Sequence, residues 1–203
     1  MLQIIFVTGH LGYLSGINID EDIETNIKKI LDGKYVIDRR ALLDVEVIDE
    51  SGKVTYKDVA INEAQSLASD LNKVANFNVS LDDKDKVLYD FKSCGLLIST
   101  PTGSTGFSFS VGGPIVSPKV KCLVVQPIYP HAFNQRAFVV EDDKPLYVVL
   151  PDYNQALYID GQKLISLQKN DTIRVVVGKN SVAFITLTSN VFFKNLKNKI
   201  RSI

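Results

Sequence analysis

The sequence predicts an α+β protein: a mainly β, sandwich-like domain, preceded by a short strand, loop and helix and followed by a final helix. Three patterns predict this. From about residue 42 onward, apolar and polar residues alternate in short runs separated by turn residues, which is typical of antiparallel strands. Apolar residues recur at helical spacing over residues 23–31, and residues 191–203 carry an apolar face opposite a row of lysines.

Residues 1–34 read as the last unit of an α/β domain. An apolar strand is expected at residues 3–8 and a glycine-punctuated turn at residues 9–16. The helix that follows has Asp20 as its candidate N-cap, and Gly33 ends it.

Residues 35–189 form the predicted β domain. Asp, Gly and Lys clusters separate its apolar runs, which indicates turns between short strands. The expected strands are 42–49, 54–61, 77–81, 86–91, 121–127, 137–141, 145–150, 156–160, 172–177 and 182–188.

The final helix, within residues 190–203, has Phe192, Leu196 and Ile200 on one face. A basic amphipathic helix can lie on a membrane, but one that docks its apolar face on its own protein is far commoner. We therefore expect a docked helix.

Composition narrows the function. The 203 residues are 45% hydrophobic and 23% charged, as in ordinary globular proteins. Lys plus Arg and Asp plus Glu are 23 each, so no overall field favours nucleic acid or an anionic membrane, and neither partner is expected. The two cysteines suggest neither a disulfide framework nor a metal site, and no targeting or membrane-spanning pattern appears, so we expect a cytoplasmic protein without a bound structural metal.

The stretch from Cys94 to Pro114 carries the strongest functional signal. An apolar run leads into STPTGST at 99–105, where small hydroxyl side chains surround a proline and a glycine. Glycine lets the backbone approach a polar ligand, and a helix opening at Ser104 or Thr105 would direct free N–H groups at an anion. A loop of this composition can also simply turn the chain.

Further motifs accompany this loop. In order, the chain reads GHLGYL at 9–14, NE at 62–63, STPTGSTGFSFSVGGPI at 99–115, PIYPHAFNQRAFVV at 127–140 and DGQ at 160–162. This series closely resembles the NAD kinase family along nearly the whole chain. The resemblance implies transfer of a phosphoryl group from ATP, with Mg²⁺ or another divalent metal, to the adenosine ribose 2′-hydroxyl of NAD, which gives NADP. It also implies a homodimer or homotetramer whose C-terminal helix packs back on the N-terminal unit.

The resemblance also assigns the dinucleotide site. The family places its Asn-Glu pair on the dinucleotide, and a carboxylate beside an amide suits a ribose diol. The family contacts the nucleotide from a neighbouring subunit at the DGQ turn. The candidate binding residues are Asn62, Glu63, Lys92, Cys94, Thr105, Gly106, Phe107, Ser108, Ser110 and Gln162.

Three positions depart from the family pattern. Cys94 stands where relatives carry an aspartate, and a thiol that is mostly neutral at pH 7 cannot replace a carboxylate facing donor groups. Gly106 and Phe107 stand where relatives read Ala-Tyr, so Phe107 keeps an aromatic face without the phenolic hydroxyl.

The family's catalytic base is the aspartate of a GGDG motif, and these 203 residues contain no such sequence, so the catalytic residue is not assigned. Two readings stay open. The chain is an N-terminally truncated form of an NAD kinase, or it is a homologue that binds NAD(P) as an oligomer without turnover. A Rossmann dehydrogenase is disfavoured, because no strand is followed by G-x-G-x-x-G at the start of a helix.

Overall fold

The computed structural model describes residues 2–3, 6–7, 17–18, 23–68, 70, 73–152, 155–189 and 191–200. The chain forms two compact units. Residues 1–40 and 181–203 make up the first, and residues 41–180 make up the second. The GHLGYL loop and Asp20 lie outside the described residues.

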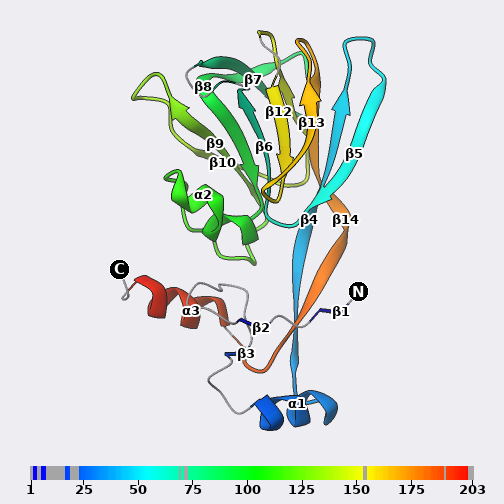
Figure 1. Cartoon of the computed structure of the whole chain (residues 1–203), viewed down its shortest axis with the longest axis vertical. Helices are drawn as coiled ribbons and strands as arrows, with labels where there is room; N and C mark the ends of the chain where they lie inside the picture. The colour runs from blue at the N-terminus through cyan, green and yellow to red at the C-terminus, as the bar shows by residue number, and fades with distance from the viewer. Residues whose placement is uncertain are drawn as a thin grey trace. The chain divides into compact units, whose positions relative to one another are not determined.

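The second unit contains most of a curled, largely antiparallel sheet of twelve strands within the described residues (Figure 1). Along its main path the strands run in the order β13-β12-β6-β8-β7-β11-β14-β4-β5, with β9 paired to β8 and to β10. Their bounds are β4 Val36–Ile48, β5 Val54–Ala60, β6 Glu63–Ala68, β7 Ala75–Leu81, β8 Val87–Ser99, β9 Leu123–Pro130, β10 Phe138–Val140, β11 Leu146–Val149, β12 Gln155–Ile159, β13 Gln162–Leu167 and β14 Thr172–Thr186.

The mainly β character predicted from the sequence is confirmed, with three corrections to individual strands. The strands expected at 172–177 and 182–188 are one continuous strand, β14, because the segment at 178–181, exposed at 179–181, stays extended. The apolar run at 96–98 continues the strand that begins at Val87, and the polar residues between did not reveal that continuity. Strands β6 and β13 were not predicted.

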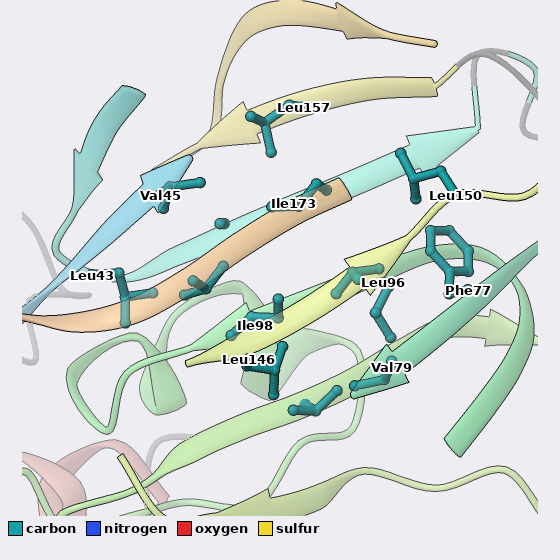
Figure 2. Packing of buried hydrophobic residues seen from close by; sticks show 14 of the residues in the cluster. Leu43, Val45, Phe77, Val79, Leu96, Ile98, Leu146, Leu150, Leu157 and Ile173 are labelled. Carbon is teal, nitrogen blue, oxygen red and sulfur yellow. The ribbon is translucent and has the colours of Figure 1, made fainter. Parts of the chain in front are cut away.

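The core of the second unit lies between the inner faces of the curled sheet. Side chains from β4, β7, β8, β11, β12 and β14 point toward one another (Figure 2). Phe77, Leu96 and Leu157 are at most 2% exposed. Burial of large side chains contributes roughly 1.5–3 kcal/mol each, so this cluster fixes the strands on which the site is built.

Three described hairpin turns have a clear local cause. Asp160 and Gly161 join β12 to β13 with φ of 48° and 81°, as a two-residue type I′ turn requires. Asp82, with φ of 70°, begins the predicted charged turn before β8. Between β4 and β5, the Asp49 carboxylate accepts hydrogen bonds from the backbone N–H groups of Ser51 and Lys53.

The first unit contains two helices and short strands. The strands are β1 Leu2–Gln3, which pairs with β14, and the parallel pair β2 Phe6–Val7 and β3 Ile17–Asn18. Helix α1, Ile23–Leu31, is the predicted helix, and Gly33 ends it with φ of 73° and its N–H bonded to the Ile30 carbonyl. Helix α3, Val191–Ile200, is the predicted final helix, with Phe192 buried. In the described part of the chain, no helix combines the length and apolarity that a membrane crossing needs.

Candidate functional site

The candidate site is built on three segments of the second unit that meet at one end of the sheet. They are the turn at residues 61–63, the loop after β8 and the β12–β13 hairpin. Strand β6 begins at Glu63, which pairs with Ser99 on β8, and the next residue, Ala64, pairs with Ile159 on β12. The register therefore brings the Asn-Glu pair between the STPTGST loop and the DGQ turn.

The Asp160 carboxylate holds the turn at residues 61–63. Its Oδ2 accepts a hydrogen bond from the Ile61 N–H at 2.9 Å, and its Oδ1 accepts from the N–H groups of Asn62 at 2.8 Å and Glu63 at 3.1 Å. The Asp160 N–H in turn donates to the Glu63 carbonyl at 3.0 Å. Three consecutive backbone donors thus share one carboxylate.

The loop after β8 holds the same turn from its other side. The Thr100 hydroxyl donates to the Ile61 carbonyl at 2.8 Å, and the Thr100 N–H donates to the Asn62 carbonyl at 2.9 Å. The Ser99 hydroxyl lies 3.3 Å from the same Asn62 carbonyl oxygen and 2.8 Å from the Thr100 carbonyl oxygen. These hydroxyls therefore brace the site.

Gly103 is required by the closeness of this packing. A Cβ at that position would lie 2.2 Å from the Asn62 carbonyl oxygen and 2.6 Å from the Ser99 Oγ. No side chain fits there without displacing backbone, so the glycine of STPTGST serves contact between loop and turn.

The helix expected to open at Ser104 or Thr105 is wrong in position, because no helix begins at either residue. A 3₁₀ turn, η1, spans Thr102–Thr105, and a single turn of helix, α2, spans Phe107–Ser110 (Figure 1). The Ser104 hydroxyl accepts the Val116 N–H at 2.8 Å. So short a helix offers little dipole for an anion, and Ser104 ties the loop down.

Glu63 is the unusual group of the site. Its side chain is buried, with 5% of its surface exposed, and its Oε2 has no hydrogen-bond partner among the described residues. Burial, with the Asp160 charge adding to it, raises the pKa of Glu63 to about 7. The same oxygen lies 3.6 Å from where a Cβ on Gly106 would stand, so the carboxylate reaches the junction of η1 and α2.

Other predicted residues surround this junction or the adjacent turn. Thr105 is half-buried, Gly106, Phe107 and Ser110 are exposed, and Ser108 is fully buried with its Oγ unpartnered in the described structure. Gln162 begins β13 directly after the Asp160–Gly161 turn, and it is exposed. The structure thus brings Asn62, Glu63, Thr105, Gly106 and Gln162 to the same end of the sheet.

Cys94 and Lys92 lie elsewhere on β8. Cys94 is five residues before Ser99, roughly 16 Å along an extended strand, and Lys92 is farther still. Cys94 is half-buried between the buried residues Ser93 and Gly95, whereas Lys92 is exposed. The two residues do not join the cluster around Glu63.

The described residues do not fit a metal site. Among them, no three histidine, cysteine, aspartate or glutamate side chains are grouped to hold an ion. Glu63 and Asp160 are adjacent carboxylates, but both Asp160 oxygens already accept backbone N–H groups.

Asp160 and Thr100 were missed as site residues. The Asp-Gly pair between two apolar runs is a recognisable type I′ turn signal, and it predicts the hairpin. It does not predict that the aspartate bonds to residues 97 to 99 positions away.

Comparison with known proteins gives one consistent family. A family model described as the ATP-NAD kinase C-terminal domain matches residues 61–187. The NAD kinase of Clostridium beijerinckii is 32% identical over 194 residues, which cover 95% of this chain and 66% of that protein. The NAD kinase of Carboxydothermus hydrogenoformans is 30% identical, with 95% and 68% covered. The chain thus spans about two thirds of the length of these relatives.

Solved structures agree on the fold. Yeast NADH kinase complexed with NADH superposes with a TM-score of 0.89 at 21% identity, over 98% of this chain and 59% of that one. An NAD kinase from Archaeoglobus fulgidus in complex with ATP gives a TM-score of 0.76 at 25% identity, over 97% and 72%. The chain belongs to the NAD kinase family.

Proposed function

We propose that this chain binds NAD for ATP-dependent phosphorylation of its adenosine ribose 2′-hydroxyl, which yields NADP. The observation that carries the proposal is the buried Glu63 carboxylate. Its Oε2 has no hydrogen-bond partner in the described structure and lies beside the junction of η1 and α2. Buried polar atoms are otherwise nearly always paired, so a ligand that donates hydrogen bonds would complete this one. A ribose diol offers two such donors.

The proposed binding residues divide by position. Asn62 and Glu63 would hold the ribose, with Thr105, Gly106, Phe107, Ser108 and Ser110 along the loop beside it. Lys92 and Cys94 lie far enough along β8 to meet the other end of a dinucleotide. Gln162, at the exposed start of the terminal strand β13, would approach a nucleotide held by a second copy of the chain.

The reaction would proceed by attack of the ribose 2′-oxygen on the γ-phosphorus of ATP. The bond from that phosphorus to the β–γ bridging oxygen breaks, ADP leaves with the electron pair, and the hydroxyl proton passes to a base. A divalent metal would accompany ATP and neutralise its phosphate charge. This chain's contribution is to orient the hydroxyl, and positioning supplies much of the rate in phosphoryl transfer.

Oligomerisation and compartment are part of the proposal. Phe133 is 87% exposed and Leu31 is 82% exposed, and large apolar side chains at such exposure suit contacts with another polypeptide. We propose a homodimer or homotetramer in the cytoplasm. Sedimentation of the chain as a single folded monomer at micromolar concentration would contradict the oligomer.

The test separates binding from turnover. Calorimetric titration of the purified chain with NAD should show saturable binding, whereas NADP formation from NAD and Mg-ATP should be weak. The reason is that the GGDG aspartate, the base in the family, is not among these 203 residues. A longer polypeptide that supplies GGDG should raise the rate.

Two outcomes would change this view. Absence of NAD binding would contradict the proposed function. Rapid NADP formation by the 203 residues alone would assign the base to another carboxylate, and Glu63, with its pKa of about 7, has the titration range that a general base needs.

A further inference from the structure

We propose that Asp160 is a positioning residue for the dinucleotide site, whose carboxylate holds the turn at residues 61–63 so that Glu63 presents an unpaired oxygen to the ribose. The inference rests on the proposed function for the identity of the ligand. It assigns to the aspartate of the hairpin a role separate from that expected of Gln162.

The backbone of the turn at residues 61–63 is almost fully hydrogen-bonded within the protein. The three N–H groups of residues 61–63 donate to Asp160, at 2.8 to 3.1 Å. The carbonyls of Ile61 and Asn62 accept from Thr100. With these backbone groups satisfied inside the protein, the side chains of Asn62 and Glu63 are what the turn can offer to a ligand.

Asp160 lies in a tightly constrained hairpin turn. Its φ of 48° and that of Gly161, 81°, fix a tight hairpin, and Ile159 pairs with Ala64 of β6 on one side and with Gln162 of β13 on the other. The carboxylate is therefore carried by a rigid two-residue turn anchored in the sheet. A flexible side chain on a long loop could not hold three donors in this way.

Burial and the neighbouring charge of Asp160 both act on Glu63, and no cation in the described structure offsets the Glu63 carboxylate. Three backbone N–H groups donate to the Asp160 carboxylate, whereas Glu63 has an oxygen with no donor. Asp160 thus both places Glu63 and opposes its ionisation, so binding through the ionised Glu63 carboxylate should strengthen as pH rises.

The experiment compares the full chain with its Asp160→Asn variant by NAD titration from pH 5.5 to 8.5. Asparagine keeps the size of the side chain but removes the charge and one acceptor oxygen. At pH 8.5 we expect roughly tenfold weaker NAD binding, because the turn loses a charge-assisted bond. The pH midpoint of binding should move to lower pH, because Glu63 then ionises without a neighbouring charge.

A purely structural role would lower affinity by the same factor at every pH and leave the midpoint where it is. That result would overturn the inference. The matched control is Asp49→Asn, since Asp49 also accepts two backbone N–H groups and a hydroxyl in a hairpin turn, but between β4 and β5. It should leave both the affinity and the midpoint unchanged.

Two further measurements keep the test decisive. Glu63→Gln retains the backbone N–H groups that bond to Asp160. It should abolish the rise of NAD affinity with pH. A rise that persists in this variant would contradict the role of Glu63. If the wild type binds no NAD, the proposed function fails. Carbon NMR titration of the Glu63 carboxyl group then decides the role of Asp160. The pKa of Glu63 should be lower in Asp160→Asn than in the wild type, and an unchanged pKa of Glu63 overturns the inference.

Discussion

Two glutamates on strands of the same sheet have opposite surroundings. Glu46 on β4 is paired twice, with Lys57 Nζ at 2.6 Å and Arg174 Nη1 at 3.0 Å. Its hydrogen bond with Lys57, assisted by Arg174, lowers the pKa of Glu46. Glu63 on β6 has no such cation in the described structure, and burial, with the Asp160 charge adding to it, raises the pKa of Glu63 to about 7.

The difference separates a structural carboxylate from one available to a ligand. Glu46 joins three strands across the outside of the sheet, and its charge is already balanced. The fold holds Glu63 in a position that costs stability, because an unpaired buried charge is unfavourable. Such a position is expected where a ligand supplies the missing partners.

The pH dependence of the free energy of unfolding tests the difference between the two glutamates most strongly. The folded-state pKa of Glu63 is raised from 4.5 to about 7, so the carboxyl group's contribution to stability is fully present below pH 4.5 and is lost as pH rises through about 7. The loss is on the order of 3 kcal/mol. In Glu63→Gln, the free energy of unfolding should be higher than in the wild type at pH 8 and nearly equal at pH 5. Denaturant unfolding at the two pH values measures this, and equal stability at pH 8 would contradict an unpaired Glu63.

The next effect concerns the glycine that lets the loop meet the turn. Gly103→Ala places a Cβ 2.2 Å from the Asn62 carbonyl oxygen, so backbone must move. We expect a loss of about 2 kcal/mol in the free energy of unfolding and weaker NAD binding. Gly106→Ala is the matched comparison. Its Cβ would lie 3.1 Å from the Gly103 carbonyl oxygen and 3.6 Å from Glu63 Oε2, a closer approach than usual but much milder than at Gly103, so it should lower stability clearly less than Gly103→Ala does. Similar thermal melts for the two variants would refute the close packing.

A third variant adds a carboxylate at a different place. Cys94→Asp restores the residue that the family resemblance places there, at a half-buried position where an acid can keep contact with water. We expect NAD binding to tighten by roughly tenfold through a charge-assisted hydrogen bond. Calorimetry and a thermal melt together measure this. A collapsed melt would assign Cys94 to the core instead.

The smallest effect is expected at the paired glutamate. Glu46→Gln removes the charge that Lys57 and Arg174 share, at a side chain that is 18% exposed. We expect a loss of about 1 kcal/mol in the free energy of unfolding at pH 7. The lowered pKa of Glu46 means that this contribution is present at neutral pH and lost on acidification, opposite in sign to that of Glu63. NAD affinity should not change, and a change would remove the distinction between the two residues.

The sequence predicted local features of the fold better than long-range ones. Helical spacing and Gly33 located α1, and alternation located most strands. Strand β6 was missed because all its residues but Leu67 are small or polar, in the sequence EAQSLA, and five of the six are buried nevertheless. Burial there follows from pairing with β8 and β12 on either side, which no local pattern records.

In the candidate site, too, the residues in local motifs were predicted and the long-range contacts were not. Asn62, Glu63 and the STPTGST loop were identified from motifs, and the structure places them together. The aspartate that holds them was missed, because its three bonds join positions nearly 100 residues apart. The loop that carries Ser99, Thr100 and Ser104 was expected to approach a polar ligand, and the structure engages the hydroxyls of these residues in bonds within the loop and to the turn.

The central claim is that the unpartnered Glu63 carboxylate binds the dinucleotide. Calorimetric titration of NAD into the wild type and Glu63→Ala at pH 8 tests it most directly, since at that pH the wild-type carboxylate is mostly ionised. We predict at least roughly tenfold weaker binding in the variant, as expected for loss of a buried charge-assisted contact. Equal affinity in the two proteins would contradict the claim and remove Glu63 from the site.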